Sequence, residues 1–146
     1  SLIIAALRMG MQINVVAPEM NEAARDPELM QIAAASDNYR TFDNLREAVL
    51  ESDVVYTDTW LDMEFFNDER FEPEKERRIR LFGPYQLNRQ VLEGSEALVM
   101  HCLPAHRGYE IESELVDDPR SVVFEQAENR LHSQKAVLLK LAGQLS

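Results

Sequence analysis

A cysteine with basic neighbours is the first feature of this sequence that could carry out chemistry. Cys102 follows the apolar run 97–101 closely, with His101 before it and His106 and Arg107 shortly after it. Cationic neighbours stabilise a thiolate, so this setting is expected to lower the pKa of the thiol from its reference value of ~8.5. Free cysteine is also among the most buried residue types, so the alternative role of Cys102 is that of a small core residue.

Charged residues follow two other apolar runs. Asp58 comes directly after 53–57, where its carboxylate could face an incoming cation or cap a turn. Arg130 is expected in the first turn of a closing helix, where the helix dipole opposes a cation. An anionic partner would explain that placement, and a surface ion pair with Glu125 or Glu128 is the alternative.

Several classes of site and partner have little support. The 15 Lys and Arg against 26 Asp and Glu give a net charge of -11, which disfavours nucleic acid and anionic membranes as partners. The 3 His and 1 Cys show no zinc-ligand spacing, and no phosphate-binding glycine motif is present. No run approaches the ~20 apolar residues of a membrane span. The sequence therefore predicts a soluble protein with no metal or cofactor, and the unpaired cysteine suits the cytoplasm.

The elements that must position these residues follow from the apolar pattern. With 146 residues, 45% of them hydrophobic, the chain is expected to form one globular domain. Short β-branched runs predict strands, and apolar residues at helical spacing predict helices. The strands are expected at 13–17, 39–42, 53–57, 97–101 and 121–124, and the helices at 1–9, 28–35, 43–52, 73–82, 88–92 and 125–145, with Asp43 as a helix cap.

This alternation predicts an α/β fold: a doubly wound parallel sheet with helices on both faces. In such a sheet, ligands bind at the carboxyl ends of the strands. The segments 58–64, 101–108 and 125–130 each follow a predicted strand. All three are therefore expected to converge on one rim of the sheet.

Two of these segments resemble a known family. The segment 101–108 reads His-Cys-Leu-Pro-Ala-His-Arg-Gly and 128–136 reads Glu-Asn-Arg-Leu-His-Ser-Gln-Lys-Ala, and both are similar to signature segments of the ornithine carbamoyltransferases. The segments 53–60 and 84–88 and the opening residues resemble the same family in the same order. The resemblance implies the second-domain fold of the aspartate and ornithine carbamoyltransferases.

The resemblance also implies a reaction that needs no cofactor. The δ-amino group of ornithine attacks the carbonyl carbon of carbamoyl phosphate, and citrulline and phosphate are formed. Asp58 would hold the amino acid substrate, and Cys102 would lie beside the reacting amine. The main-chain carbonyls of Cys102 and Leu103 would receive the carbamoyl NH2 group, and Arg130 would supply charge to carbamoyl phosphate. Cys102 and Arg130 are thus the expected catalytic residues.

One substrate-contacting loop departs from the family pattern. The family usually reads Asp-x-Trp-x-Ser-Met-Gly, whereas this chain has Asp62 in place of the Ser and Glu64 in place of the Gly. Met63 is retained and could offer its backbone N–H to the substrate α-carboxylate. A carboxylate at position 62 would disfavour that α-carboxylate, so another amine such as putrescine is the alternative substrate.

The resemblance implies that residues 1–146 are the ornithine-binding half of a longer subunit, truncated at the N-terminus. The carbamoyl phosphate-binding domain is absent from this chain, which alone is expected to be inactive. Members of the family act in arginine biosynthesis as homotrimers with shared active sites. A function of another class, a non-catalytic amino-acid-binding module, is the alternative to the enzyme.

Overall fold

The computed structural model describes residues 2–20, 25–61, 63–66 and 68–144. Its strands are all parallel, as the sequence predicts. Strand β1 (Ile13–Val15) pairs with β2 (Tyr39–Thr41), and β3 (Val54–Thr57) pairs with β4 (Leu98–His101). The α/β fold class with parallel strands is confirmed, although the strands form two pairs within the described ranges.

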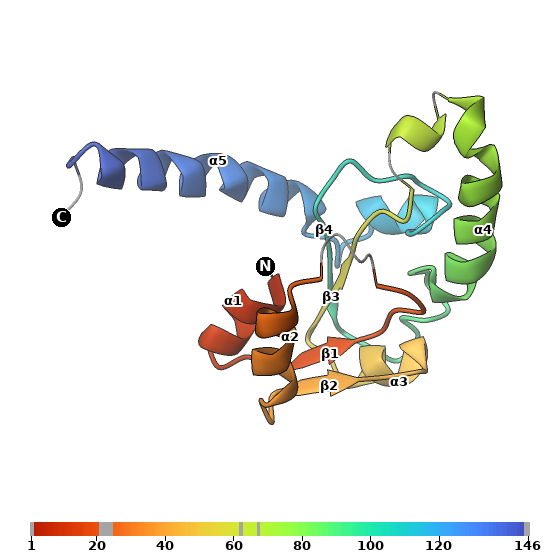
Figure 1. Ribbon diagram of the computed structural model, residues 1–146, viewed down its shortest axis with the longest axis horizontal. Coiled ribbons are helices and arrows are strands. Elements are labelled where there is room, and N and C mark those ends of the chain that lie inside the picture. Colours follow the sequence, from red (N-terminus) through yellow and green to blue (C-terminus); the bar gives the residue numbers. More distant parts are fainter. Residues whose placement is uncertain (1, 21–24, 62, 67, 145–146) are drawn as a thin grey trace.

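Five α-helices accompany these strands in the described part of the chain: α1 (Leu2–Arg8), α2 (Pro27–Ala34), α3 (Leu45–Leu50), α4 (Glu72–Phe82) and α5 (Val123–Leu141). Helices α1 and α2 lie beside β1 and β2, and α4 lies on the other side of the strands (Figure 1). Each begins and ends within a few residues of its predicted range. None of the helices in the described segments is long and apolar enough to cross a membrane.

The cap of α3 is one residue later than predicted. Asn44, rather than Asp43, is the N-cap: its side-chain oxygen accepts hydrogen bonds from the backbone N–H groups of Arg46 (2.9 Å) and Glu47 (3.3 Å). These two N–H groups have no partner within the helix, which is why a side-chain acceptor is favoured at this position.

The helix predicted at 88–92 is wrong, because 89–94 forms turns. The guanidinium of Arg46, in α3, donates hydrogen bonds to the carbonyl oxygens of Gln90 (2.7 Å) and Glu93 (3.0 Å). These bonds to a distant helix stabilise the turns in place of the predicted helix. A contact between segments this far apart in the sequence leaves no local pattern.

The last of the predicted strands, 121–124, is also wrong. Ser121 forms only an isolated bridge with Val99, and α5 already begins at Val123. The backbone N–H of Gln126 donates to the Val122 carbonyl at 2.8 Å, which completes the first helical turn. The β-branched pair Val122 and Val123 therefore forms the N-cap and first residue of α5 rather than part of a strand.

Two apolar clusters form the core of the described residues. The first includes Val99 of β4 and comprises Val49, Leu87, Leu92, Val99, Ile111, Leu115 and Val116. The second comprises Trp60, Leu61 and Phe65, with Phe71, Ile79, Phe82 and Tyr109 packed against it. The second cluster fixes the loop that follows β3, because Trp60 stacks on Phe82 of α4 at 5.8 Å between ring centroids.

Candidate functional site

The pairing of β3 with β4 brings two of the predicted site residues together. Thr57 lies opposite His101 in the parallel register, so Asp58 and Cys102 leave the two strands side by side. The Cys102 thiol donates a hydrogen bond to Asp58 Oδ1 at 2.8 Å. The same oxygen accepts the backbone N–H of Thr59 at 2.7 Å. The carboxylate thus receives two hydrogen bonds at the open end of the strand pair.

The expected lowering of the Cys102 pKa is wrong. Burial raises the pKa of the thiol, and the hydrogen bond to Asp58 and the charge of that carboxylate raise it further. Two of the basic neighbours face other partners: His101 contacts Glu110, and Arg107 is paired with Asp117 at 2.6 Å. Cys102 is partly exposed and protonated at neutral pH, a hydrogen-bond donor beside Asp58 rather than a thiolate nucleophile.

Tyr56 also belongs to this group, although no motif in the sequence singled it out. Burial, followed by the effects of Cys102 and of the Asp58 charge, raises the pKa of the phenol to about 12. Tyr56 lies in β3, two residues before Asp58, which follows the strand directly, so the strand period directs the two side chains to the same side. That period-two spacing is the signal by which it could have been found.

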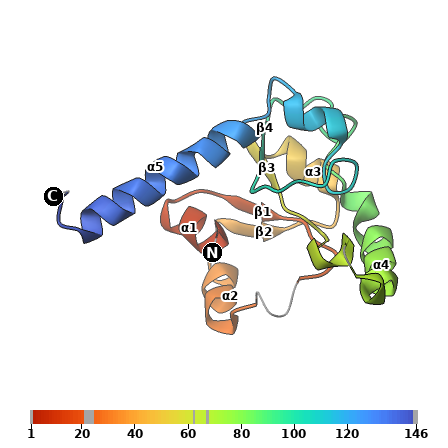
Figure 2. The same ribbon diagram turned by 90° about the horizontal axis from the view of Figure 1, so that it is seen from above.

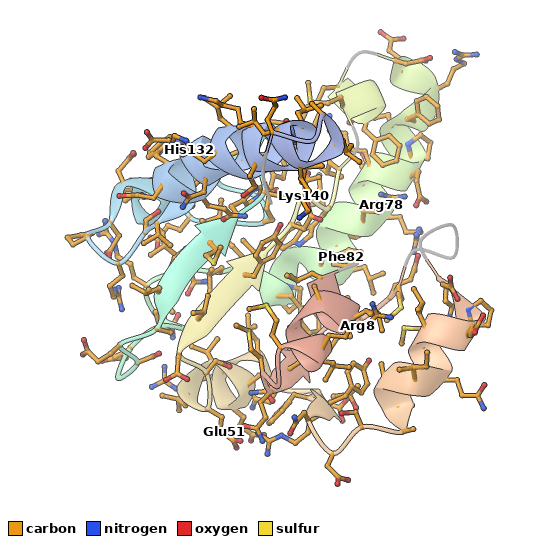
Figure 3. All side chains as sticks on the ribbon, turned by 90° about the vertical axis from the view of Figure 1, so that its left-hand side faces the viewer. Arg8, Glu51, Arg78, Phe82, His132 and Lys140 are labelled. Atoms are coloured by element: carbon orange, nitrogen blue, oxygen red, sulfur yellow. The ribbon has the colours of Figure 1, made fainter. Side chains whose placement is uncertain are left out.

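The loops after β3 and β4 are joined by a second contact. Thr59 Oγ1 lies 2.8 Å from His106 Nδ1 and donates to the Leu61 carbonyl at 2.9 Å. Arg78 of α4 donates to the carbonyl oxygen of Trp60 at 3.0 Å. Arg78 and Phe82, which contact Trp60, both belong to α4 (Figure 3). Trp60 itself is buried, so it packs the loop.

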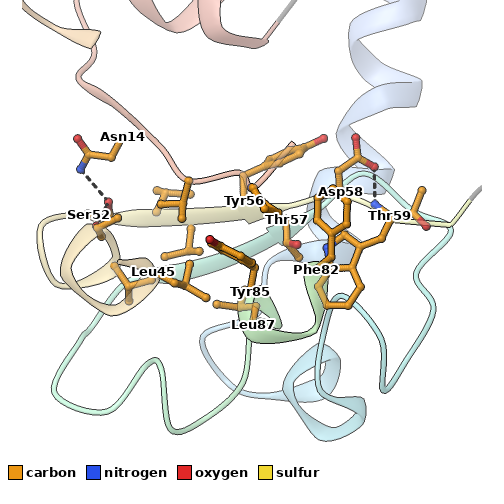
Figure 4. Close-up of a pocket in the computed structure, with 17 residues that line it drawn as sticks. Asn14, Leu45, Ser52, Tyr56, Thr57, Asp58, Thr59, Phe82, Tyr85 and Leu87 are labelled. Carbon is orange, nitrogen blue, oxygen red and sulfur yellow. Dashed lines mark hydrogen bonds between the residues drawn. The ribbon is translucent and has the colours of Figure 1, made fainter. Parts of the chain in front are cut away.

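A cavity of about 320 Å³ extends from this rim between the end of β1, α3 and β3. Figure 4 shows Asn14 and Ser52 at one end and Asp58 and Thr59 at the other. Its volume lies within the range of small-molecule sites in proteins. Asp58 is the only carboxylate among its lining residues, so within the described chain the cavity has one anionic end.

The remaining predicted site residues of the two loops are Leu103, Met63 and Asp62. The Leu103 backbone N–H donates to His101 Nδ1 at 2.8 Å, and its φ is 52°. Met63 begins a short 3-10 helix, 63–66, and is exposed. Asp62 lies outside the described residues.

Arg130 lies beyond the first turn of α5, because that helix begins at Val123, earlier than predicted. The dipole of α5 therefore gives no reason to expect an anionic partner at Arg130. Arg130 is exposed and makes no hydrogen bond or ion pair with any residue of the described segments. The ion pair expected with Glu125 or Glu128 is therefore not formed. Glu128 faces His132 instead, with 3.8 Å between Oε1 and Nε2. The exposed guanidinium of Arg130 remains available to an anion.

No group of three or more metal-ligating side chains occurs in the part of the chain described.

Comparison with known proteins places the whole chain. The family model for the Asp/Orn-binding domain of aspartate/ornithine carbamoyltransferase matches residues 1–141. The ornithine carbamoyltransferase of Archaeoglobus fulgidus is 44% identical over 100% of this chain and 46% of its own length. The anabolic enzyme of Pseudomonas aeruginosa is 48% identical over 94% of this chain and 43% of its own.

Solved structures agree with these relatives. Ornithine carbamoyltransferase from Pyrococcus furiosus superposes with a TM-score of 0.79 at 36% identity, covering 100% of this chain and 46% of that one. The chain thus spans about half the length of the relatives it matches. It belongs to the aspartate/ornithine carbamoyltransferase family, as the Asp/Orn-binding domain.

Proposed function

We propose that this chain is the ornithine-binding half of an ornithine carbamoyltransferase, which transfers the carbamoyl group of carbamoyl phosphate to the δ-amino group of ornithine. The observation that carries the proposal is the Asp58–Cys102 pair at the joined ends of β3 and β4, in a chain whose matched relatives bear that name. A carboxylate at one end of a cavity of about 320 Å³ suits a small cationic amino acid.

The geometry supports a division of roles. Asp58 attracts the δ-ammonium group, which gives one proton to solvent, and holds the resulting amine against the carbamoyl carbon. The new N–C bond forms as the C–O bond to phosphate breaks. Phosphate leaves with the electron pair of that bond and takes the second proton, which the amine nitrogen gives up. Cys102 keeps its proton, so it orients Asp58 and the amine without attacking the substrate itself.

The carbamoyl group is bound by main-chain atoms and a cation in this proposal. The carbonyls of Cys102 and Leu103 accept hydrogen bonds from its NH2 group. Arg130 supplies positive charge to the phosphate and is free of other partners for that role within the described residues. Residues of the half of the relatives that this chain does not match complete the phosphate site.

The proposal extends to the setting of the reaction. We place it in arginine biosynthesis, in the cytoplasm, in a homotrimer with shared active sites. Support comes from the family resemblance of the 101–108 and 128–136 segments. Sedimentation of the full-length gene product would give a mass three times that of its chain.

The direct test is citrulline formation by the full-length gene product with ornithine and carbamoyl phosphate. Asp58→Asn should lower kcat/KM for ornithine at least tenfold, because it removes the charge that holds the amine. Asp53→Asn, which removes an exposed carboxylate at the other end of β3, is the matched control. The 146-residue chain alone should form no citrulline. Binding of ornithine without turnover by the full-length product would favour the amino-acid-binding module instead.

Asp62 provides the test of substrate identity. Two like charges ~4 Å apart repel by about 1 kcal/mol in water and roughly 4 at an effective dielectric near 20. If Asp62 faced the substrate α-carboxylate, ornithine would be penalised by up to about a thousandfold and putrescine would not. We expect a preference for ornithine that Asp62→Ser leaves in place. A preference for putrescine that Asp62→Ser reverses would identify the diamine as the substrate.

A further inference from the structure

A buried carboxylate outside the predicted site joins both ends of the loop that carries Cys102. Glu110 has no exposed surface, and neither does the side chain of His101. Glu110 Oε1 lies 3.1 Å from His101 Nε2 and accepts the backbone N–H of His106 at 2.6 Å. A carboxylate removed from water requires such donors, so its position is fixed by them.

The hydrogen bonds determine which nitrogen of His101 carries the proton. The Leu103 backbone N–H donates to Nδ1 at 2.8 Å, so Nδ1 is an acceptor without a proton. Nε2 therefore carries the hydrogen and donates it to Glu110. Because a carboxylate can only accept, Glu110 selects the tautomer that leaves Nδ1 open to Leu103.

The Leu103 hydrogen bond matters because of its backbone conformation. Leu103 has a φ of 52°, in the left-handed region that residues with a side chain rarely adopt. Such a conformation persists only where its surroundings enforce it. Here the His101 imidazole, itself held by Glu110, supplies the acceptor that does so.

We propose that Glu110 is a positioning residue for carbamoyl transfer, which acts through the His101 tautomer to hold the 101–106 loop in its reactive shape. This inference rests on the proposed function. Glu110 links to the reaction through the carbonyls of Cys102 and Leu103 and through the Cys102 thiol at Asp58. Its other oxygen, Oε2, lies 3.8 Å from His106 Nδ1 and has no hydrogen-bond partner within the described ranges. One oxygen thus holds both ends of the loop.

The test compares Glu110→Ala with Glu110→Gln in the full-length gene product. Glutamine keeps an oxygen that can accept from both His101 and His106, whereas alanine keeps none. Glu110→Ala should lower kcat on the order of 10²-fold per folded site, and Glu110→Gln should restore it to within severalfold of the wild type. Glu114→Gln, an exposed carboxylate near the same loop, is the control and should leave kcat unchanged.

Nitrogen NMR of the His101 ring gives a readout that loss of stability would not produce. The wild type and Glu110→Gln should show Nε2 protonated and Nδ1 unprotonated, and Glu110→Ala should show a mixture of tautomers. His101→Asn, which can accept from Leu103 but cannot reach Glu110, should reduce kcat as Glu110→Ala does. The double variant should lose no more than either single variant.

Each contrary result overturns the proposal. The first is a wild-type kcat per folded site in Glu110→Ala. The second is a double variant whose loss of kcat is the product of the two single losses. The third is a folded Glu110→Gln that keeps the wild-type tautomer of His101 but loses turnover. If Glu110→Ala fails to fold, the Glu110→Gln and His101→Asn variants still decide. Alkylation of Cys102, the single cysteine, should be severalfold faster when the loop loosens. This rate and the NMR signal need no turnover, so a wild type that forms no citrulline would refute the proposed function alone.

Discussion

At the residue scale, Cys102 and Asp58 form one coupled pair. The Asp58 carboxylate accepts the S–H hydrogen bond and opposes a second negative charge, and both effects favour the thiol over the thiolate. Asp58→Asn should therefore lower the pKa of Cys102 and speed its alkylation by iodoacetamide at pH 8. The rate against pH would be measured for Asp58→Asn, for Asp53→Asn as control and for the wild type. An unchanged or slower reaction in Asp58→Asn alone would contradict the coupling.

At the element scale, the cap of α3 separates two adjacent candidates. Asn44 bonds to the first free N–H groups of the helix, whereas Asp43 stands one residue too early. Asn44→Ala should destabilise the protein by about 1 kcal/mol, a typical value for loss of an N-cap. Asp43→Ala, at an exposed position, should cost less than about 0.5 kcal/mol. Urea unfolding of both variants measures the difference, and equal losses would show that the cap does not stabilise α3.

At the scale of the whole molecule, α5 is anchored at one end only. Val123 is buried and the Gln126 side chain accepts the backbone N–H of His101, but Leu131, Leu138 and Leu141 are 59%, 66% and 80% exposed. Figure 2 shows the rest of α5 projecting beyond the strands. In the 146-residue chain, amides of 133–141 should exchange with solvent faster than those of β4, because an unpacked helical segment is marginally stable. Uniform protection along α5, measured by hydrogen exchange, would contradict this expectation.

The elements whose signals are local could be predicted from the amino-acid order. Apolar runs at strand or helix spacing predicted β1 to β4 and all five α-helices in the described residues, and the order of these elements predicted parallel pairing. Because parallel strands present their carboxyl ends together, the meeting of Asp58 with Cys102 followed from the order of elements alone. The family resemblance rested on contiguous segments, which is why it required no structure.

The features that depend on distant contacts became visible in the folded protein. Arg46 of α3 binds the carbonyl oxygens of the turns at 90–93. The run at 121–123, which resembles a strand in sequence, leads into α5. Burial raises the pKa of Cys102, and Asp58, which faces the thiol, raises it further, while His101 and Arg107 are paired elsewhere. The role of Glu110 could not be predicted from the sequence, because it depends on the hydrogen bonds that the buried carboxylate makes to His101 and His106 in the folded chain. Charge, burial and hydrogen bonding act through space, so neighbours in the sequence did not reveal them.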